Sequence, residues 1–507
     1  MKDLKQKAIR GGLARLCSQA ANFAVRLGSL MILARLLDPK DFGLVGMVTA
    51  FTGVLSLFRD FGLSAAAVQR ETISEEQAST LFWINVSVSV LLALLALAMA
   101  PAIARFYHEP RLLGVTGVLA AGFVFNGAGV QHSAMLQRQM RFTALAVTGT
   151  VSLLAGTLVA VAGAKAGYGY WALVAMTVTM PLTSTIAFWA TTTWVPGMPR
   201  RGAALRSMIR FGGTLTLNGL VAYIAYNLEK VLLGRFWGAD AIGLYGRGYQ
   251  LINIPTDNLN SAIGEVAFSA LSRIRDDRCR LKSYFLKGYS LVLSLTVPIT
   301  TVCALFANDV IAVFLGAKWK EAAPIVRLLA PTIFVFAVIN PLGWLLYSLG
   351  LVERSLKIAL VFAPLIITGY LIGLPYGPRG VAAAYSAVII LWMLPHIAWC
   401  VHRTIVSFWD ILRTASPPVV SGVLAGMFAV TVRSFYGQFL PPLLRLVLES
   451  SVVCAAYLGI LLFAAGQRSF YLDLLRGFKA ASSGEEKNLI SARASNGASR
   501  VSPLVRG

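Results

Sequence analysis

Residues 80–104 read TLFWINVSVSVLLALLALAMAPAIA, and this stretch decides the fold class. A helix of that length crosses the roughly 30 Å hydrocarbon core of a lipid bilayer. Similar apolar stretches recur about fourteen times. We expect them near 12–35, 42–64, 80–104, 112–136, 142–166, 168–192, 207–233, 242–268, 285–307, 323–349, 355–374, 380–402, 417–436 and 443–465. The sequence therefore predicts an all-α polytopic membrane protein with about fourteen transmembrane helices.

The composition of the whole chain agrees with this fold class. Of 507 residues, 57% are hydrophobic and 13% are charged, whereas a soluble domain carries about 25% charged residues. This excludes a disordered chain and a secreted disulfide scaffold, and it disfavours a soluble enzyme. The 45 Lys and Arg against 22 Asp and Glu leave a net charge of +23. In a membrane protein, that excess indicates basic cytoplasmic loops or a cavity for an anion rather than nucleic-acid binding.

The basic residues also predict the orientation in the membrane. With the N-terminus inside, about 28 of the 45 Lys and Arg fall in inside loops and about 11 in outside loops. An even number of spans then places both termini in the cytoplasm. Residues 478–507 are rich in Ser, Ala, Gly and Arg, and we expect a disordered cytoplasmic tail there.

An internal repeat indicates a duplicated unit. Residues 35–44 (RLLDPKDFGL) align without gaps with residues 235–244 (RFWGADAIGL), at an offset of 200. Because six spans per copy is an even number, both copies insert the same way round, as parallel repeats do. We expect a cytoplasmic segment at 1–11, a first six-helix bundle at 12–199, a second at 200–403, two further helices at 404–477 and the tail.

Polar residues lie on single faces of several predicted spans. Such residues are candidates for function because charges are costly at bilayer depth. Helical spacing groups them as Arg15, Gln19, Asn22 and Arg26 in the first span; Thr49, Thr52, Ser56 and Arg59 in the second; and Arg247, Gln250, Asn253, Asp257 and Asn260 in the eighth, while the seventh carries Asn218, Glu229 and Lys230. The pattern predicts a hydrophilic cavity between two bundles.

Structural explanations compete with a functional role for most of these charges. Arg15 lies close enough to the inner face to snorkel, and Glu229 lies near the outer end of its span, where it could be solvated. Arg59 and Asp60 are adjacent and could neutralise each other. Arg26 is the hardest to explain in this way, since it lies about 16 Å from Arg15, near the middle of the membrane.

Several kinds of chemistry have no support in the sequence. There is no GxxxxGK[ST] phosphate loop, HExxH pattern or paired-carboxylate motif. The five cysteines and four histidines show no ligand-like spacing, so neither a metal site nor a cofactor is expected. We therefore expect a transporter and not an enzyme.

Several short segments carry a resemblance to a known family. They are 33–44 (LARLLDPKDFGL), 59–66 (RDFGLSAA), 69–70 (QR), 82–85 (FWIN), 101–107 (PAIARFY), 243–245 (GLY) and 247–249 (RGY). The chain resembles the polysaccharide transporter (Wzx-type) flippases of the multidrug/oligosaccharidyl-lipid/polysaccharide exporter superfamily, in particular their colanic-acid/succinoglycan-exporter-like branch. The match covers most of the first 300 residues.

The resemblance implies a fold and a cargo. The fold is two six-helix bundles in a V around a central cavity, with two extra C-terminal helices. The cargo is an undecaprenyl-pyrophosphate-linked oligosaccharide, moved between the leaflets of a bacterial inner membrane for exopolysaccharide, capsule or lipopolysaccharide synthesis. Relatives have a cationic cavity and use an ion gradient. They usually work beside a polysaccharide polymerase and a chain-length regulator.

A site hypothesis combines the resemblance with the polar faces. Arg side chains pair with phosphate bidentately, so the predicted pyrophosphate ligands are Arg15, Arg26, Arg59 and Arg247. The predicted sugar contacts are Gln19, Asn22, Asn218, Gln250 and Asn253. The candidates for ion coupling are Asp60, Glu229 and Asp257.

Two other functions stay open at this point. A cation-coupled multidrug exporter of the same superfamily would need acids deep in the first bundle, where this sequence has Arg26. A membrane-embedded polysaccharide polymerase or ligase would show a large periplasmic loop, and the loops here are short. The glycan, the coupling ion and the oligomeric state cannot be inferred from the sequence.

Overall fold

The structure, a computed structural model, describes residues 21–59, 74–199, 205–274, 277–436, 440–468 and 471. Residues 21–36 are helical. The helices that follow are α2 (Pro39–Phe58), α4 (Glu75–Tyr107), α5 (Arg111–Arg138), α6 (Phe142–Lys165), α7 (Tyr170–Thr191), α8 (Leu205–Arg273), α9 (Arg278–Leu305), α10 (Ala307–Phe314), α11 (Ala322–Ser348), α12 (Val352–Gly373), α13 (Gly377–Val401), α14 (Phe408–Tyr436) and α15 (Pro442–Gly459). Two 3₁₀ turns, η1 (Ala317–Trp319) and η2 (Leu374–Tyr376), and a π-helical turn, η3 (Ile460–Ala464), complete the set.

The predicted fold class is confirmed. Ten segments of the described chain are long and apolar enough to cross a membrane, and one of them, Val352–Val401, contains both α12 and α13. The bounds of α5 and α6 lie within two residues of the predicted spans 112–136 and 142–166. The count of fourteen spans stays a prediction.

Helix α8 corresponds to two predicted spans, the seventh and the eighth. Its 69 residues are interrupted at Gly238, whose φ of 80° is not helical. Glycine adopts this left-handed backbone without the steric penalty that a Cβ imposes. The chain therefore turns back at Gly238 and continues as a second helical segment.

Capping residues explain where α2 and α4 begin. Asp38 and Asp41 form a reciprocal capping box at the start of α2, and Pro39 occupies its first turn. Ser74 and Gln77 form the same box at the start of α4. Each box satisfies backbone N–H groups that a helix start would otherwise leave unpaired.

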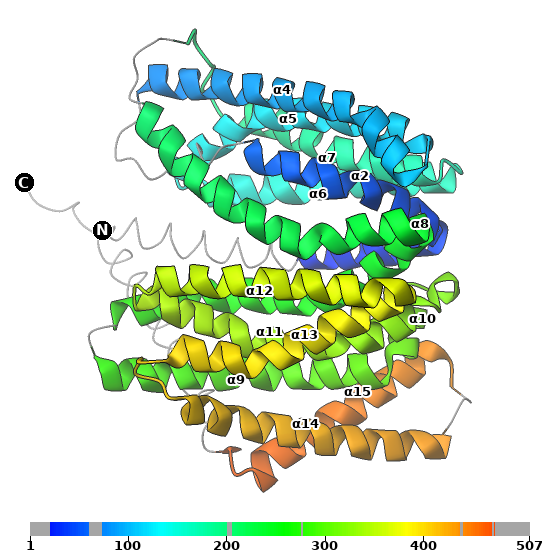
Figure 1. The fold of residues 1–507 in the computed structure, drawn as a ribbon, viewed down its shortest axis with the longest axis vertical. Helices are drawn as coiled ribbons and strands as arrows, with labels where there is room; N and C mark the ends of the chain where they lie inside the picture. The colour runs from blue at the N-terminus through cyan, green and yellow to red at the C-terminus, as the bar shows by residue number, and fades with distance from the viewer. Residues whose placement is uncertain are drawn as a thin grey trace, which may run out of the picture.

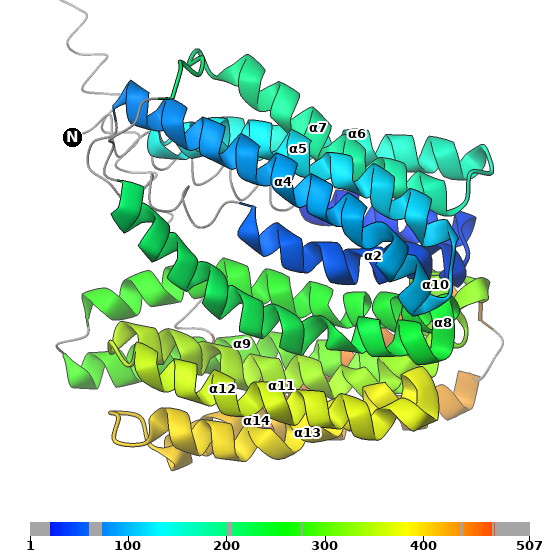
Figure 2. The ribbon, with the colours of Figure 1, turned by 45° about the horizontal axis from the view of Figure 1, so that its top comes forward.

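The helices form two groups that lie side by side (Figure 1). The helix of residues 21–36, α2 and α4–α7 make up the first half, and α8–α13 make up the second. Helix α8 packs on both α2 and α11 and lies at the boundary between the halves, a placement that Figure 2 also shows. Helices α14 and α15 cover the outer side of the second half, against α9 and α10. The predicted boundary at 403/404 falls between α13 and α14, although the division into domains stays a prediction.

The two halves meet at one end through the predicted repeat. A Cβ added to Gly43 would collide with the carbonyl of Ala239, and a Cβ added to Gly243 would collide with the carbonyl of Pro39. The offset of 200 residues relates Pro39 to Ala239 and Gly43 to Gly243. The same close contact is therefore made twice, once from each half. We call this contact the glycine crossing.

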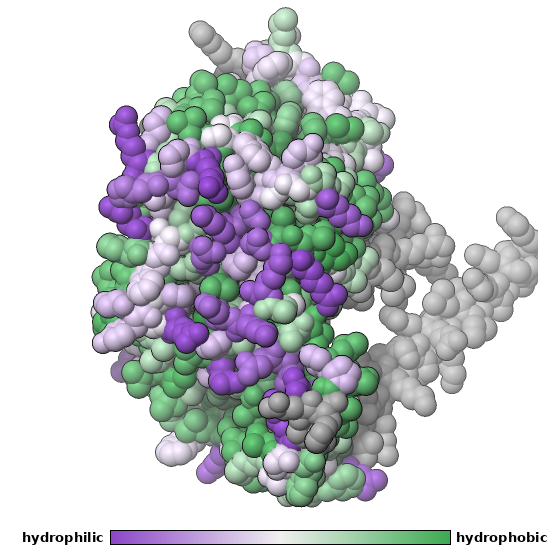
Figure 3. Space-filling view, turned by 90° about the vertical axis from the view of Figure 1, so that its right-hand side faces the viewer, coloured by the Kyte–Doolittle hydropathy of each residue, from purple (hydrophilic) through white to green (hydrophobic). Residues whose placement is uncertain are grey.

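Further bonds between the halves surround the glycine crossing. Buried Trp319 donates its indole N–H to the carbonyl of Ala34 at 2.7 Å. Its ring lies 5.4 Å from that of Phe42, edge to face. The Lys318 Nζ lies 2.8 Å from Asp38 Oδ1, and both of these side chains are exposed. This end of the molecule presents a hydrophilic central band (Figure 3), as expected of a surface that faces water.

A cluster of four charges attaches the two last helices to the second half. Asp309 of α10 is fully buried and is held by Arg445 of α15, whose Nε lies 2.7 Å from Asp309 Oδ1. Arg433 of α14 lies 3.3 Å from Asp309 Oδ2 and 3.0 Å from Glu449 Oε1. Two acids and two arginines balance one another, which is what buried charges require.

Candidate functional site

A cavity of about 570 Å³ lies between the two halves, directly inside the glycine crossing. The first half lines it with the helix of residues 21–36, with α2, and with side chains of α6 and α7. The second half lines it with α8. Its polar lining residues are Arg26, Ser29, Thr49, Thr177, Lys230, Tyr249, Arg247, Gln250 and Asn253. We call it the central cavity.

Arg247 connects the two halves across this cavity. Its guanidinium lies 4.1 Å from the centre of the Phe42 ring, within the range of a cation–π interaction. It also donates a hydrogen bond to the side-chain carbonyl of Gln250, one turn further along α8. Arg247 is therefore oriented by an aromatic ring of the first half and an amide of the second.

The central cavity is cationic. Arg26 is exposed on the helix of residues 21–36 and lines the cavity, and half-buried Lys230 lines it from α8. The Lys230 ammonium donates to Asn227 Oδ1 at 2.6 Å, and its charge also interacts with the buried carboxylate of neighbouring Glu229. No Asp or Glu is among the described residues that line the cavity. Three positive groups without an acid favour an anionic ligand.

Two smaller polar pockets adjoin the central cavity within the first half. One of about 310 Å³ shares Thr49 and Thr177 with the central cavity. A second, of about 260 Å³, shares Arg59 and Asn126 with the first. The three spaces thus form one series that runs along α2, α5 and α7.

The structure brings part of the predicted site together. Arg26, Arg247, Gln250 and Asn253 all line the central cavity. Arg59 lines the two smaller pockets at the far end of the series. Asn22 is half-buried on the helix of residues 21–36 and is not among the lining residues. The expected grouping of arginines is therefore split between two places.

Several predicted residues cannot be placed. Arg15, Gln19 and Asp60 lie outside the described residues, and the side chains of Asn218, Asp257 and Asn260 are not described either. Their predicted roles stay predictions.

Glu229 is deeply buried in the second half. It is 1% exposed, so it does not lie at a solvated interface, which was one explanation of its place in the sequence. Neighbouring Lys230 reaches the central cavity, whereas Glu229 does not line it.

Uncharged polar residues of the first half were missed by the sequence analysis. Asn126, Ser133 and Gln137 of α5 line the last pocket together with Ser184 and Thr185 of α7. Their positions on α5 follow the same i, i+7, i+11 spacing that marked the face of Arg15, Asn22 and Arg26. This spacing could have predicted a polar face on α5. It is a weak indication, because amides and hydroxyls in spans also join helices.

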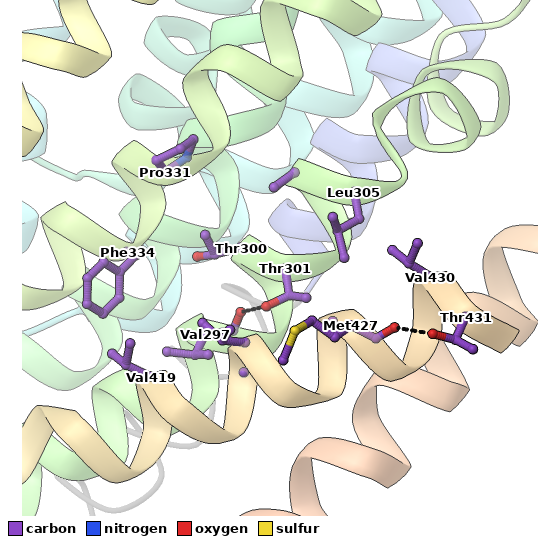
Figure 4. Close-up of a pocket in the computed structure, with 14 residues that line it drawn as sticks. Val297, Thr300, Thr301, Leu305, Pro331, Phe334, Val419, Met427, Val430 and Thr431 are labelled. Carbon is purple, nitrogen blue, oxygen red and sulfur yellow. Dashed lines mark hydrogen bonds between the residues drawn. The ribbon is translucent and has the colours of Figure 1, made fainter. Parts of the chain in front are cut away.

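A fourth cavity has the opposite lining. A groove of about 650 Å³ lies between α9, α11 and α14 and is almost wholly apolar (Figure 4). Its threonines are turned back on their own helices, since Thr301 donates to the Val297 carbonyl and Thr431 to the Met427 carbonyl, both at 3.0 Å. The groove offers nothing to hold a charged ligand.

Comparisons with known proteins agree with the resemblance seen in the sequence. The family model for "Polysaccharide biosynthesis protein" matches residues 32–324. The chain is 27% identical to the lipopolysaccharide biosynthesis protein WzxC of Escherichia coli K12, over 77% of this chain and 80% of that protein. It is 22% identical to the succinoglycan biosynthesis transport protein ExoT of Rhizobium meliloti, over 90% of this chain and 93% of that protein.

Solved structures share the fold. The lipid II flippase MurJ in an inward closed conformation superposes with a TM-score of 0.72 at 14% identity, covering 92% of this chain and all of MurJ. An inward-facing multidrug transporter of the MATE family gives 0.60 at 15% identity, covering 80% and 99%. Since the family model matches more than half of its length, the chain belongs to the polysaccharide biosynthesis protein family of multi-pass membrane proteins.

Proposed function

We propose that this protein is a flippase for an undecaprenyl-pyrophosphate-linked oligosaccharide repeat unit. It moves the unit from the cytoplasmic to the periplasmic leaflet of a bacterial inner membrane, with both termini in the cytoplasm. The observation that carries the proposal is the central cavity, which has three cationic side chains and no described acid. Family membership and the names of WzxC and ExoT support a role in polysaccharide export.

The cation cluster suits the pyrophosphate group. Arg26 and Arg247 each offer a planar fork of N–H donors that can bind phosphate oxygens in pairs. Lys230 adds a point charge from the second half. At an effective dielectric constant of about 20, each charge pair at 4 Å contributes about 4 kcal/mol before desolvation. Arg15 and Arg59 remain proposed contacts of the same ligand in other stages of transport.

The position of the cluster suits alternating access. The cavity is closed at one end by the glycine crossing, and its cations come from both halves. A pyrophosphate that binds Arg26 and Arg247 together holds the first half against the second. Rocking of one half against the other would part the crossing and expose the head group to the periplasm.

Ion coupling is assigned to the buried acid of the second half. Glu229 is buried and lies next to Lys230, a lining residue of the central cavity. A change in its protonation or cation binding would alter the charge beside the cavity. Asp60 and Asp257 stay further candidates, and a polymerase and a chain-length regulator are the proposed neighbours in the membrane.

The proposal is tested by replacing Arg26. In a strain that lacks the chromosomal gene, lipid-linked repeat units should accumulate facing the cytoplasm, and the wild-type chain should restore export. Arg26→Gln should lower export at least about tenfold while the protein stays inserted, because one charge-assisted phosphate contact is lost. Arg280→Gln is the matched control, since that side chain is 69% exposed at the start of α9.

The outcomes separate the candidate functions. Normal surface polysaccharide from Arg26→Gln would overturn the assignment of Arg26. Drug sensitivity of the deletion strain with normal glycan would instead favour a multidrug exporter, whose fold is also similar to this one. The acid-free lining argues against that exporter, because a cationic drug would meet only like charge.

A further inference from the structure

The two smaller pockets of the first half have a lining that differs from that of the central cavity. Arg59 is the one charged residue among their described lining residues. The others are apolar residues, glycines, the amides of Asn126 and Gln137, and hydroxyl groups. The hydroxyls belong to Thr49, Thr52, Ser56, Ser133, Thr177, Ser184, Thr185 and Tyr223.

The hydroxyl groups are fixed in one orientation. Ser56 donates to the Thr52 carbonyl at 3.0 Å, and Thr177 donates to the Leu173 carbonyl at 2.9 Å. Thr185 donates across the bundle to the Phe125 carbonyl at 2.6 Å. A hydroxyl that donates its proton in this way still has lone pairs that accept hydrogen bonds. The wall is therefore a preorganised set of acceptors.

Donors are supplied by the amides. The Asn126 Nδ2 donates to the Gly122 carbonyl at 2.8 Å, which holds the amide toward both pockets that it lines. Gln137 adds a second amide about three helical turns further along α5. Neutral donors and acceptors placed close together match the hydroxyl groups of sugars, each of which donates one hydrogen bond and accepts others.

Small residues create the space. Gly122 lines the nearer pocket, and a Cβ added there would meet only Pro181 at 4.0 Å. Gly53 lines the same pocket and is covered by Tyr223 of α8, whose hydroxyl donates to the Thr49 carbonyl at 3.1 Å. Tyr223 thus closes the pocket with a further hydroxyl from the second half of the chain.

We propose that these two pockets are the oligosaccharide subsite and that Asn126 and Gln137 determine which repeat units are carried. This inference rests on the proposed function. The pyrophosphate binds at Arg26, Lys230 and Arg247, and the sugars extend past Thr49 and Thr177 into the first half. Sugars beyond the first occupy the two pockets, which therefore recognise the glycan. The cations of the central cavity recognise the pyrophosphate of the lipid carrier.

The test compares two glycolipids in proteoliposomes that contain the purified full-length chain. One is undecaprenyl pyrophosphate with a single sugar, and the other carries a complete repeat unit. Asn126→Ala combined with Gln137→Ala should slow the complete unit at least about tenfold relative to the single-sugar lipid, because two hydrogen-bonding side chains are lost. Gly122→Leu should do the same by filling the pocket. Gly149→Leu, at an exposed position of α6 with open space around it, is the control.

Each result decides the proposal. Continued movement of the single-sugar lipid demonstrates that a variant is folded, and a selective loss of the complete unit supports the subsite. An equal loss for both lipids, or no loss for either, overturns it. If the wild-type chain moves neither lipid, both the proposed function and the subsite are wrong. If only the subsite is wrong, the wild-type chain still moves both lipids and Arg26→Gln is still defective with both.

Discussion

The two halves of the molecule are alike where they meet and different inside. At the glycine crossing, Gly43 approaches the Ala239 carbonyl and Gly243 approaches the Pro39 carbonyl. Inside the first half, α2, α5 and α7 enclose polar pockets. Inside the second half, two thirds of the span in α11 is buried, and tyrosines stack in pairs.

The offset of 200 residues allows equivalent positions of the two halves to be compared. Arg26 of the first half corresponds, 200 positions on, to Tyr226 of the second. Tyr370 and Tyr385 stack 5.5 Å apart, and the hydroxyl of Tyr385 lies 3.4 Å from that of Tyr249. At these equivalent positions the second half carries the aromatic Tyr226, whereas the first half carries Arg26, which lines the central cavity. The repeat keeps the same close contact in both halves, whereas the interiors of the halves are packed differently.

The largest effect is expected at the glycine crossing. Gly43→Ala places a methyl group against a backbone carbonyl, which cannot move aside as a side chain can, and overpacking of this kind costs about 1–3 kcal/mol. The closed end should open, and a cysteine at Thr177 should react about tenfold faster with an impermeant maleimide added outside cells.

Gly243→Ala should have the same effect as Gly43→Ala, because the contact is made twice. Gly288→Ala in α9 is the control, since a Cβ there meets nothing within 4 Å. A response from only one of the two crossing variants would show that the halves are not equivalent at this end.

A smaller effect is expected from the interior of the second half. Glu229→Gln keeps the shape of the side chain and removes the charge. If Glu229 couples transport to an ion gradient, gradient-driven export should fall about tenfold while movement without a gradient stays unchanged. Glu353→Gln, at an exposed position of α12, is the control. An unaltered response to the gradient would leave Glu229 with a structural role only.

The smallest effect is expected from the ion pair beside the crossing. Lys318 and Asp38 have side chains that are 50% and 64% exposed. A double-mutant cycle of Lys318→Gln and Asp38→Asn, measured by thermal unfolding, should give a coupling of about 0.2–1 kcal/mol. The asparagine can still cap α2. A much larger coupling would mean that charge, and not the glycine contact, holds the halves together.

Much of the fold could be predicted because it depends on local properties. Apolar length determines where a span begins and ends, and α5 and α6 follow their predicted ranges closely. The repeat at 35–44 and 235–244 predicted the duplication. The contact between the two copies could not be predicted. A glycine indicates that another segment approaches closely, but the sequence does not show which segment that is.

The site was harder to predict because it is formed between helices. The spacing of Arg26 on its helix, and of Arg247, Gln250 and Asn253 on α8, predicted four lining residues. Arg59 was assigned to the same cluster, yet it lies in the pockets of the first half. Asn126 and Gln137 were missed because an uncharged polar residue in a span can either join two helices or line a pocket. Only the packing of the helices distinguishes these two positions.

The buried cluster around Asp309 has a consequence for synthesis. The described partners of this carboxylate, Arg433 and Arg445, belong to α14 and α15, and α10 leads directly into the turn that holds Trp319. A buried carboxylate without its partners is strongly destabilising. During insertion, we therefore expect α10 and the Trp319 turn to reach their final packing only after α14 and α15 have entered the membrane. The packing of a segment that contacts the first half would then depend on helices that are synthesised after it.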